Sequence, residues 1–133
     1  MKLENIKEWF DRKWFMIKRF FKHTYQYWSR GFSDKETWEL YDEIAKFVHP
    51  RLVIFRKLNN GIPYGETEKS WDKKLDKMII SFDMLSRYDE IEESWCTLEN
   101  SKYKSNVKKV KSDQKKIQEG LDLFAKFYHG LWW

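Results

Sequence analysis

The sequence predicts an all-α fold: one domain over residues 1–133, built as a compact bundle of four to five helices and assembled into an oligomer. Every long segment repeats its apolar residues at intervals of three or four, as amphipathic helices do. Residues 59–66 collect asparagine, glycine and proline, as loops do. The 8 Trp, 7 Tyr and 10 Phe supply much of the apolar bulk, which suggests burial against a second subunit. Burial of all these rings within one chain stays open as the alternative.

The first helix is expected over residues 3–22. Its main apolar stripe consists of Leu3, Ile6, Phe10, Trp14, Ile17 and Phe21. Further apolar side chains, among them Trp9 and Phe20, widen this surface beyond one face. A helix that is apolar over so wide an arc usually packs against two neighbours, which indicates a bundle or an oligomer.

The second helix is expected to begin at Ser33. Its hydroxyl group and the Glu36 carboxylate have the spacing of a capping box, and Gly31 suits the end of the preceding segment. The apolar stripe then continues from Trp38 to Phe55, and its spacing survives across Pro50. We therefore expect a kink or a close restart near Pro50, not a wide gap.

Two loops and two more helices complete the prediction. The loops are residues 59–66 (NNGIPYGE) and 99–106 (ENSKYKSN). The third helix carries the apolar residues from Trp71 to Leu85, and its spacing is compatible with a continuation to Leu98 that breaks near the acidic DEIEE stretch. The last helix carries apolar residues in register from Val107 to Tyr128.

The net charge of +5 is unevenly distributed. Basic residues dominate residues 1–31 and 101–133, whereas acidic residues dominate residues 32–100. This pattern indicates either complementary charges within or between chains, or a basic end that helps to hold an anionic ligand. The lone Cys96 excludes an intramolecular disulfide and favours a reducing cytosol. No signal peptide and no membrane-spanning segment are expected, because charges break every apolar run.

The residues favour no enzyme. The three histidines lie far apart and one cysteine cannot build a thiolate site, so neither a metal site nor a catalytic set is predicted. Acidic pairs at i, i+3 weakly resemble the Mg²⁺-binding pairs of MazG-type nucleotide phosphohydrolases, but their order and separations differ from that family. These pairs are Glu36–Glu39, Glu90–Glu93 and Glu119–Asp122.

Two further surfaces are basic: the lysines of residues 102–116 and the first helix. The lysines of residues 102–116 are spread around their helix and fit a solvated face better than a duplex-binding surface. The first helix is basic and amphipathic, as helices on membrane surfaces are. Its tryptophans on several sides favour burial in protein instead, so no duplex nucleic acid and no membrane are expected as partners.

The stretch YWSRGFSDKETWEL, residues 27–40, is the candidate ligand site. Arg30 offers a planar fork of donors suited to phosphate, and a base can stack on aromatic faces. Asp34, next to a helix start that favours anions, offers a carboxylate for a base edge. These are the parts of a small-nucleotide site, with Trp28, Trp38 and Tyr41 as stacking rings and Arg19 or Lys22 as additional cations. An aromatic corner with Arg30 as a surface cap explains the same residues equally well.

Three blocks carry a family resemblance over nearly the whole chain. They are RGFSDKETWELYDEIAKFVHPRL at 30–52, WDKKLDKMIISFDML at 71–85 and KIQEGLDLFAKFYHGLWW at 116–133. The chain resembles a widespread family of small phage-encoded helical proteins, whose characterised branch is the fourth described family of phage anti-CBASS cyclic-dinucleotide sponges. Phe32, in place of a larger aromatic, and the final Trp133, in place of an acid, depart from the family pattern.

The resemblance implies a homotetramer that sequesters 3′,3′-cGAMP, without cleaving it, in the host bacterial cytoplasm. It implies no cofactor and supports Arg30, Asp34, Thr37 and Trp38 as motif positions. Their individual ligand roles, and those of Trp28, Tyr41 and Arg19, are our interpretation. Trp132 and Trp133 are expected in a subunit interface. The alternatives are a MazG-like Mg²⁺-dependent phosphohydrolase and a structural phage protein without a ligand.

Overall fold

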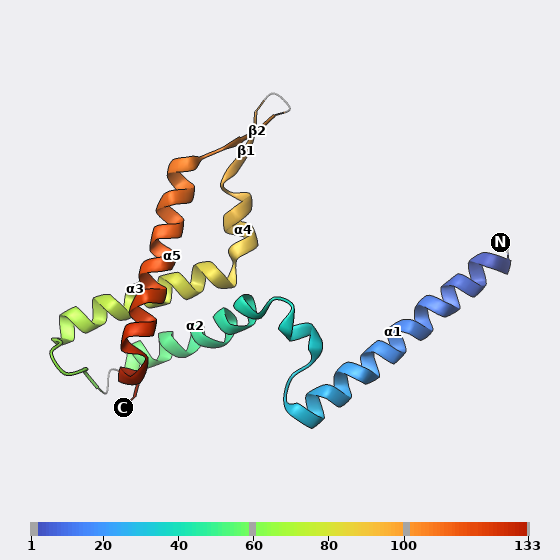
Figure 1. Cartoon of the computed structure of the whole chain (residues 1–133), viewed down its shortest axis with the longest axis horizontal. Coiled ribbons are helices and arrows are strands. Elements are labelled where there is room, and N and C mark those ends of the chain that lie inside the picture. Colours follow the sequence, from blue (N-terminus) through green and yellow to red (C-terminus); the bar gives the residue numbers. More distant parts are fainter. Residues whose placement is uncertain (1–2, 59–60, 100–101, 133) are drawn as a thin grey trace. The chain divides into compact units, whose positions relative to one another are not determined.

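The computed structural model describes residues 3–58, 61–99 and 102–132. These residues are mostly helical and include one short β-hairpin (Figure 1). In chain order the elements are α1 (Leu3–Arg30), η1 (Asp34–Thr37), α2 (Leu40–Leu58), α3 (Glu68–Ser86), α4 (Tyr88–Glu93), β1 (Cys96–Glu99), β2 (Lys102–Ser105), α5 (Val107–Phe127) and η2 (Tyr128–Gly130). The predominantly helical fold is confirmed, whereas the predicted oligomer stays a prediction.

The chain divides into two compact units, Met1–Leu40 and Tyr41–Trp133. The single domain expected over residues 1–133 stays a prediction. Within the described part of the chain, no helix is both long enough and apolar enough to cross a membrane.

In the first unit, α1 continues eight residues beyond the predicted end at position 22 and stops at Arg30. Gly31 ends it with a φ of 82°, and the Gly31 N–H donates to the Tyr27 carbonyl at 2.9 Å. This left-handed conformation costs little for glycine and is the common way in which a helix is closed. The chain can therefore turn back toward the last turns of α1.

The capping box predicted at Ser33 is wrong. Ser33 precedes the short 3₁₀ helix η1, and its side chain caps no backbone N–H. Its hydroxyl instead donates to Oε1 of Glu36 at 3.4 Å, and the Glu36 carboxylate that accepts this bond is the group that a capping box directs at the N-cap backbone N–H. The α-helix predicted from Ser33 begins only at Leu40.

In the second unit, α2 runs without interruption through Pro50. The proline removes one backbone hydrogen bond from the interior of the helix, yet the preserved apolar spacing keeps Ala45 and Leu52 on the same buried face. Neither a restart nor a gap occurs at Pro50, and the predicted stripe from Tyr41 to Phe55 lies in one helix, whereas Trp38 precedes it.

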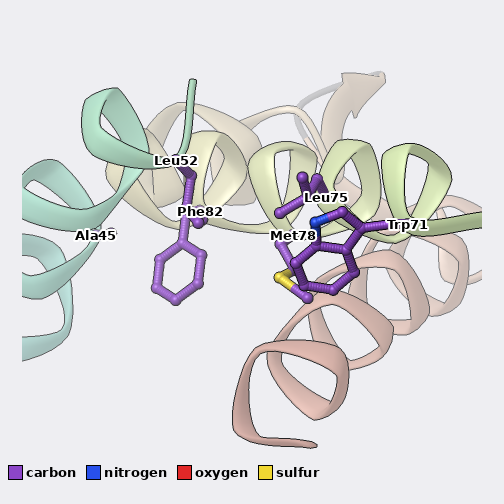
Figure 2. Packing of buried hydrophobic residues seen from close by; sticks show 6 residues of the cluster. All are labelled: Ala45, Leu52, Trp71, Leu75, Met78 and Phe82. Carbon is purple, nitrogen blue, oxygen red and sulfur yellow. The ribbon is translucent and has the colours of Figure 1, made fainter. Parts of the chain in front are cut away.

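The core of this unit is centred on α3. Trp71, Leu75, Met78 and Phe82 follow one another at intervals of three or four residues, and all are buried (Figure 2). Thr67 fixes the start of α3 with a capping box, in which its side chain accepts from the Ser70 N–H at 3.2 Å. A defined helix start sets which face of α3 meets the core.

Helix α5 crosses α3 closely at Gly120 (Figure 1). A Cβ atom at Gly120 would lie 2.2 Å from the Cβ of Ser81, so only glycine permits this approach. The Ser81 hydroxyl donates to the Ile117 carbonyl at 2.7 Å across the same contact. Phe82 and Phe124 then pack edge to face with ring centroids 4.9 Å apart.

The prediction for residues 87–106 is partly wrong. The third helix breaks at Arg87, earlier than expected, and α4 ends at Glu93. Residues predicted as helix and loop instead form the antiparallel hairpin of β1 and β2, with Cys96 paired to Ser105. Each strand has four residues, too few for the alternating pattern to stand out in the sequence.

The base of this hairpin is tied to α5. The Asn106 N–H donates to the Trp95 carbonyl at 2.7 Å, and the indole Nε1 of Trp95 donates to Oδ2 of the buried Asp113 at 3.0 Å. Of the two predicted loops, residues 61–66 are confirmed as non-helical. Residues 59, 60, 100 and 101 lie outside the described residues.

Candidate functional site

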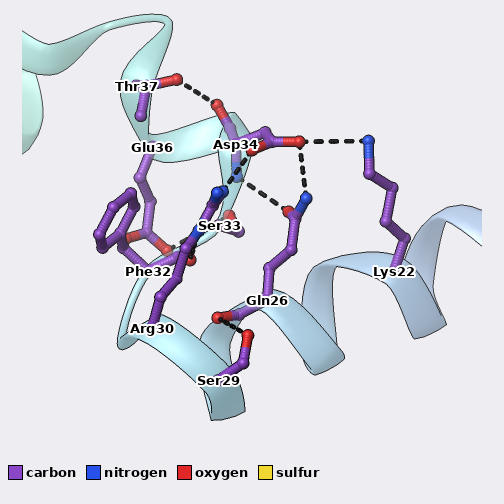
Figure 3. A network of polar contacts seen from close by, with 9 residues as sticks. All are labelled: Lys22, Gln26, Ser29, Arg30, Phe32, Ser33, Asp34, Glu36 and Thr37. Carbon is purple, nitrogen blue, oxygen red and sulfur yellow. Dashed lines mark hydrogen bonds and ion pairs between the residues drawn. The ribbon is translucent and has the colours of Figure 1, made fainter.

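The candidate site lies in the first unit, where η1 folds against the last turns of α1. Its centre is the Asp34 carboxylate, which three side chains of α1 hold (Figure 3). Gln26 Nε2 donates to Oδ2 at 2.6 Å, Lys22 Nζ lies 3.1 Å from the same oxygen, and Arg30 Nη2 donates to Oδ1. We call Lys22, Gln26, Arg30 and Asp34 the Asp34 clamp.

The local sequence explains the Asp34 clamp. Lys22, Gln26 and Arg30 are spaced by four residues, so the helix places them one above another on one face. Gln26 also accepts from the Asp34 backbone N–H through Oε1 at 3.0 Å. Arg30 Nε donates to the Phe32 carbonyl at 3.0 Å, and these bonds hold the turn that Gly31 begins.

The charges of the clamp act on Asp34. The hydrogen bond from the Arg30 guanidinium, followed by those from Gln26 and Lys22, holds the pKa of Asp34 far below its ordinary value of 3.8. Each donor favours the ionised form. Asp34 therefore remains a carboxylate throughout the physiological pH range and serves as the internal counter-ion of Lys22 and Arg30.

A cavity of about 650 Å³ lies beside the Asp34 clamp. This volume falls in the range of small-molecule sites, about 300–1,000 Å³. Four basic side chains and two carboxylates line it, together with one histidine and two aromatic rings. The lining residues are Phe15, Lys18, Arg19, Lys22, His23, Asp34, Lys35, Trp38 and Glu39.

The structure brings together four of the predicted site residues. Arg19, Asp34 and Trp38 line the cavity, and so does Lys22, which was expected as an additional cation. Arg30 is not among the lining residues and instead holds Asp34. Thr37 has a local role: its hydroxyl donates to the Asp34 carbonyl at 2.6 Å and so stabilises η1.

The remaining predicted residues have other surroundings. Trp28 is 87% exposed and is not among the residues that line the cavity. Tyr41 belongs to the second unit, where its ring packs edge to face on Tyr88 at 5.9 Å. Trp132 is exposed, and Trp133 lies outside the described residues; their predicted subunit interface stays a prediction.

Sequence reasoning missed half of the cavity. The missed residues are Phe15, Lys18, His23, Lys35 and Glu39, and Gln26 was missed in the clamp. Helical spacing held a usable signal, because positions 15, 18, 19, 22, 23, 26 and 30 recur at intervals of three or four and so share one side of α1. From this side, the sequence predicts only Arg30 and, as additional cations, Arg19 or Lys22 for the site.

The acidic pair Glu119–Asp122 and Lys116 of the last helix contact neighbouring side chains of the second unit. Glu119 forms an ion pair with Lys77, and Asp122 accepts from Gln118 at 2.7 Å. On α5, Lys116 lies 3.7 Å from Asp113. Among the described residues, no three histidine, cysteine or acidic side chains cluster closely enough to hold a metal ion.

Comparison with known proteins adds no assignment. No family model, no curated protein and no solved structure matches this chain. The residues of the cavity and the family resemblance are therefore the grounds for a ligand.

Proposed function

We propose that this chain is a phage immune-evasion protein that binds and sequesters cyclic dinucleotides such as 3′,3′-cGAMP without cleaving them. Sequestration lowers the free signal in the host bacterial cytoplasm and so blocks activation of CBASS effectors. The homotetramer that the resemblance implies is part of this proposal.

The observation that carries the proposal is the charge of the cavity. Lys18, Arg19, Lys22 and Lys35 outnumber the two lining carboxylates by two. A cyclic dinucleotide carries one negative charge on each of its two phosphodiesters, so its charge matches this excess. Phosphate groups are commonly bound by such clusters of lysine and arginine.

The rings of the cavity supply the second requirement. Trp38 is 85% exposed and Phe15 is also largely exposed, yet both line the cavity. An indole or phenyl face stacks on a base with about 1–3 kcal/mol per base. We therefore assign base stacking to Trp38 and Phe15 and phosphate contacts to Lys18, Arg19 and Lys35.

The Asp34 clamp has a positioning role in this mechanism. It holds η1 against α1 and thereby fixes Trp38 opposite the basic side chains of the helix. Lys22 belongs to both the clamp and the cavity, so a phosphate would share this cation with Asp34. A sponge acts by mass action, so its affinity and copy number decide how much free signal remains.

The test is native mass spectrometry of the full chain with a panel of cyclic dinucleotides and one linear dinucleotide as control. The expected result is a complex with a cyclic dinucleotide that releases the ligand chemically unchanged after heat denaturation. New products that require Mg²⁺ would support the phosphohydrolase instead. Absence of binding to every member of the panel would contradict the proposal and favour a structural phage protein.

Paired variants locate the site. Trp38→Ala should weaken binding about tenfold or more through lost stacking. Trp28→Ala removes an equally exposed indole outside the cavity lining and should leave the affinity within about twofold. Lys18→Ala and Lys13→Ala form a second pair, since only Lys18 lines the cavity. Equal losses within either pair would show that this cavity is not the site.

A further inference from the structure

The face of α1 away from the cavity carries an exposed apolar stripe. It consists of Ile6, Phe10, Trp14, Ile17, Phe21 and Tyr25, and all of these side chains are exposed. Leu3 and Trp28 extend it in sequence by one step of three residues at each end. Monomeric proteins rarely leave so long an apolar surface in water, so this stripe indicates a partner.

The spacing of the apolar stripe has two features that bear on its partner. From Leu3 to Trp28 the intervals are 3, 4, 4, 3, 4, 4 and 3 residues, which is an eleven-residue repeat with about 3.67 residues per turn. Helices with this repeat stay straight or coil slightly to the right when they pair. The intervals also read the same from either end of the helix.

This symmetry fits a second copy of the same helix as the partner. When two copies of α1 run antiparallel about a two-fold axis between Phe15 and Met16, every stripe position meets a stripe position. Phe10 then faces Phe21 of the second copy, and Trp14 faces Ile17 of the second copy. A symmetric homodimer needs one patch that is complementary to itself, and the stripe meets that condition over the whole helix.

The charges along α1 favour the antiparallel direction. Its acidic residues, Glu4, Glu8 and Asp11, lie in the first half, whereas residues 16–30 carry only basic charges. A parallel pair would align the two basic halves. In the antiparallel pair, Asp11 lies at the height of Lys18 and Lys22 of the second copy, on the same edge of the stripe.

Pairing leaves the side of the ligand site that Phe15, Arg19 and His23 form open, whereas Lys18 and Lys22 lie at the edge of the contact. The cavity uses Phe15, Arg19 and His23, which the helical period places on the other side of α1 from Ile17. The 28 residues of α1 span about 42 Å, enough for several layers of side chains in the contact.

From the symmetry, the exposure and the charges, we propose that the apolar stripe of α1 pairs with the same stripe of a second copy of this chain, antiparallel and two-fold symmetric. This proposal does not depend on the ligand of the cavity. Other occupants of the stripe, such as a membrane surface or a different face of the same chain, are outcomes of the test.

The first test compares neighbouring glutamate substitutions in the full chain by sedimentation velocity over a concentration series. Ile17→Glu places a charge at the centre of the contact and should weaken self-association at least about tenfold. Met16→Glu places the same charge on an exposed aliphatic residue that the helix turns away from the stripe, and should change it by less than about twofold. Circular dichroism of both variants checks that α1 still forms.

The second test measures the direction of pairing. Spin labels are placed singly at Lys7 or Lys13 in a Cys96→Ser background, because Cys96 is exposed and would react. Antiparallel pairing offsets the two labels along the axis by roughly 25 Å at position 7 and roughly 8 Å at position 13. Parallel pairing would give the same distance at both positions.

Three results would overturn the proposal. They are a wild-type chain that stays monomeric at tens of micromolar, equal effects of Ile17→Glu and Met16→Glu, and equal label distances at the two positions. A monomer that binds vesicles of phosphatidylcholine and phosphatidylserine would assign the stripe to a membrane surface. If the chain stays monomeric and does not bind vesicles, the stripe would be assigned to a contact with the remainder of the same chain.

Discussion

Residues 1–40 and residues 41–133 use the same kinds of side chain in opposite ways. In the second unit, Trp71 is completely buried between helices, and its ring meets Phe127 edge to face at 5.3 Å. In the first unit, α1 presents its rings to solvent, and Ser33 is the one buried residue among those of residues 6–40. Both units contain amphipathic helices, so periodicity alone does not determine burial.

The two units also differ in what holds them. The second unit depends on close packing, which includes the contact of Gly120 with Ser81. The first unit depends on a turn at Gly31 and the polar Asp34 clamp, while its aromatic faces remain available. The comparison teaches that the buried rings of residues 41–133 stabilise the fold, whereas the exposed rings of residues 1–40 contribute little to a core; we propose that they meet a ligand or another chain.

The largest difference between the two units should appear when one tryptophan in each is exchanged for alanine. Trp71→Ala removes a fully buried ring and should lower the free energy of unfolding by about 4 kcal/mol. Trp38→Ala removes an exposed ring and should change it by no more than about 0.5 kcal/mol. Urea denaturation followed by far-UV circular dichroism measures both, and similar losses would refute the contrast between the units.

A single methyl group at the helix crossing should have the next largest effect. Gly120→Ala places its Cβ 2.2 Å from Ser81 Cβ and 2.6 Å from the Lys77 carbonyl, so α3 and α5 must move apart. We expect a loss of about 3 kcal/mol. Gln114→Ala, on the exposed side of the same helix, is the control and should be near neutral in the same denaturation experiment.

The tie between the hairpin and α5 should have a smaller effect. Asp113→Ala leaves the buried Trp95 Nε1–H without its acceptor and should cost about 2 kcal/mol. Asp113→Asn keeps an acceptor oxygen and should cost less. Hydrogen exchange should speed up at the Asn106 amide in the alanine variant, and unchanged exchange there would show that this bond does not hold the hairpin.

The smallest effect concerns pH and the Asp34 clamp, because its groups are partly exposed and solvent screens their charges. The pKa of Asp34 is lowered in the folded chain, so its contribution is fully present above the unfolded value of about 3.8 and is lost as the pH falls below it. The NMR shifts of the Gln26 side-chain amide should stay constant from pH 7 to about pH 4 and move below that. Asp34→Asn should abolish the transition; a midpoint at the ordinary carboxyl pKa would contradict the clamp.

Local patterns predicted the elements whose signals lie within a few turns of helix. The stripe of α3 from Trp71 to Phe82 and that of α5 from Ile117 to Phe124 were predicted correctly, because three- and four-residue spacing is a property of the helix itself. The hairpin was missed because its strands are short and are held by contacts with Trp95 and Asp113, which lie 18 residues apart. The capping box at Ser33 was wrong because the Ser33 hydroxyl bonds to the Glu36 carboxylate and not to a backbone N–H.

For the candidate site, Arg19, Asp34 and Trp38 were among the residues predicted, whereas Lys18 and Lys35 were found only in the folded chain. Residues of η1 meet α1 because Gly31 reverses the chain and Asp34 reaches Lys22, Gln26 and Arg30. The sequence by itself determined the helices, their apolar faces and the basic character of α1, since these follow from residue type and spacing. Only the tertiary structure decided which rings are buried and which cations surround the cavity. Burial and the electrostatic field depend on distances between segments, and no local pattern encodes those distances.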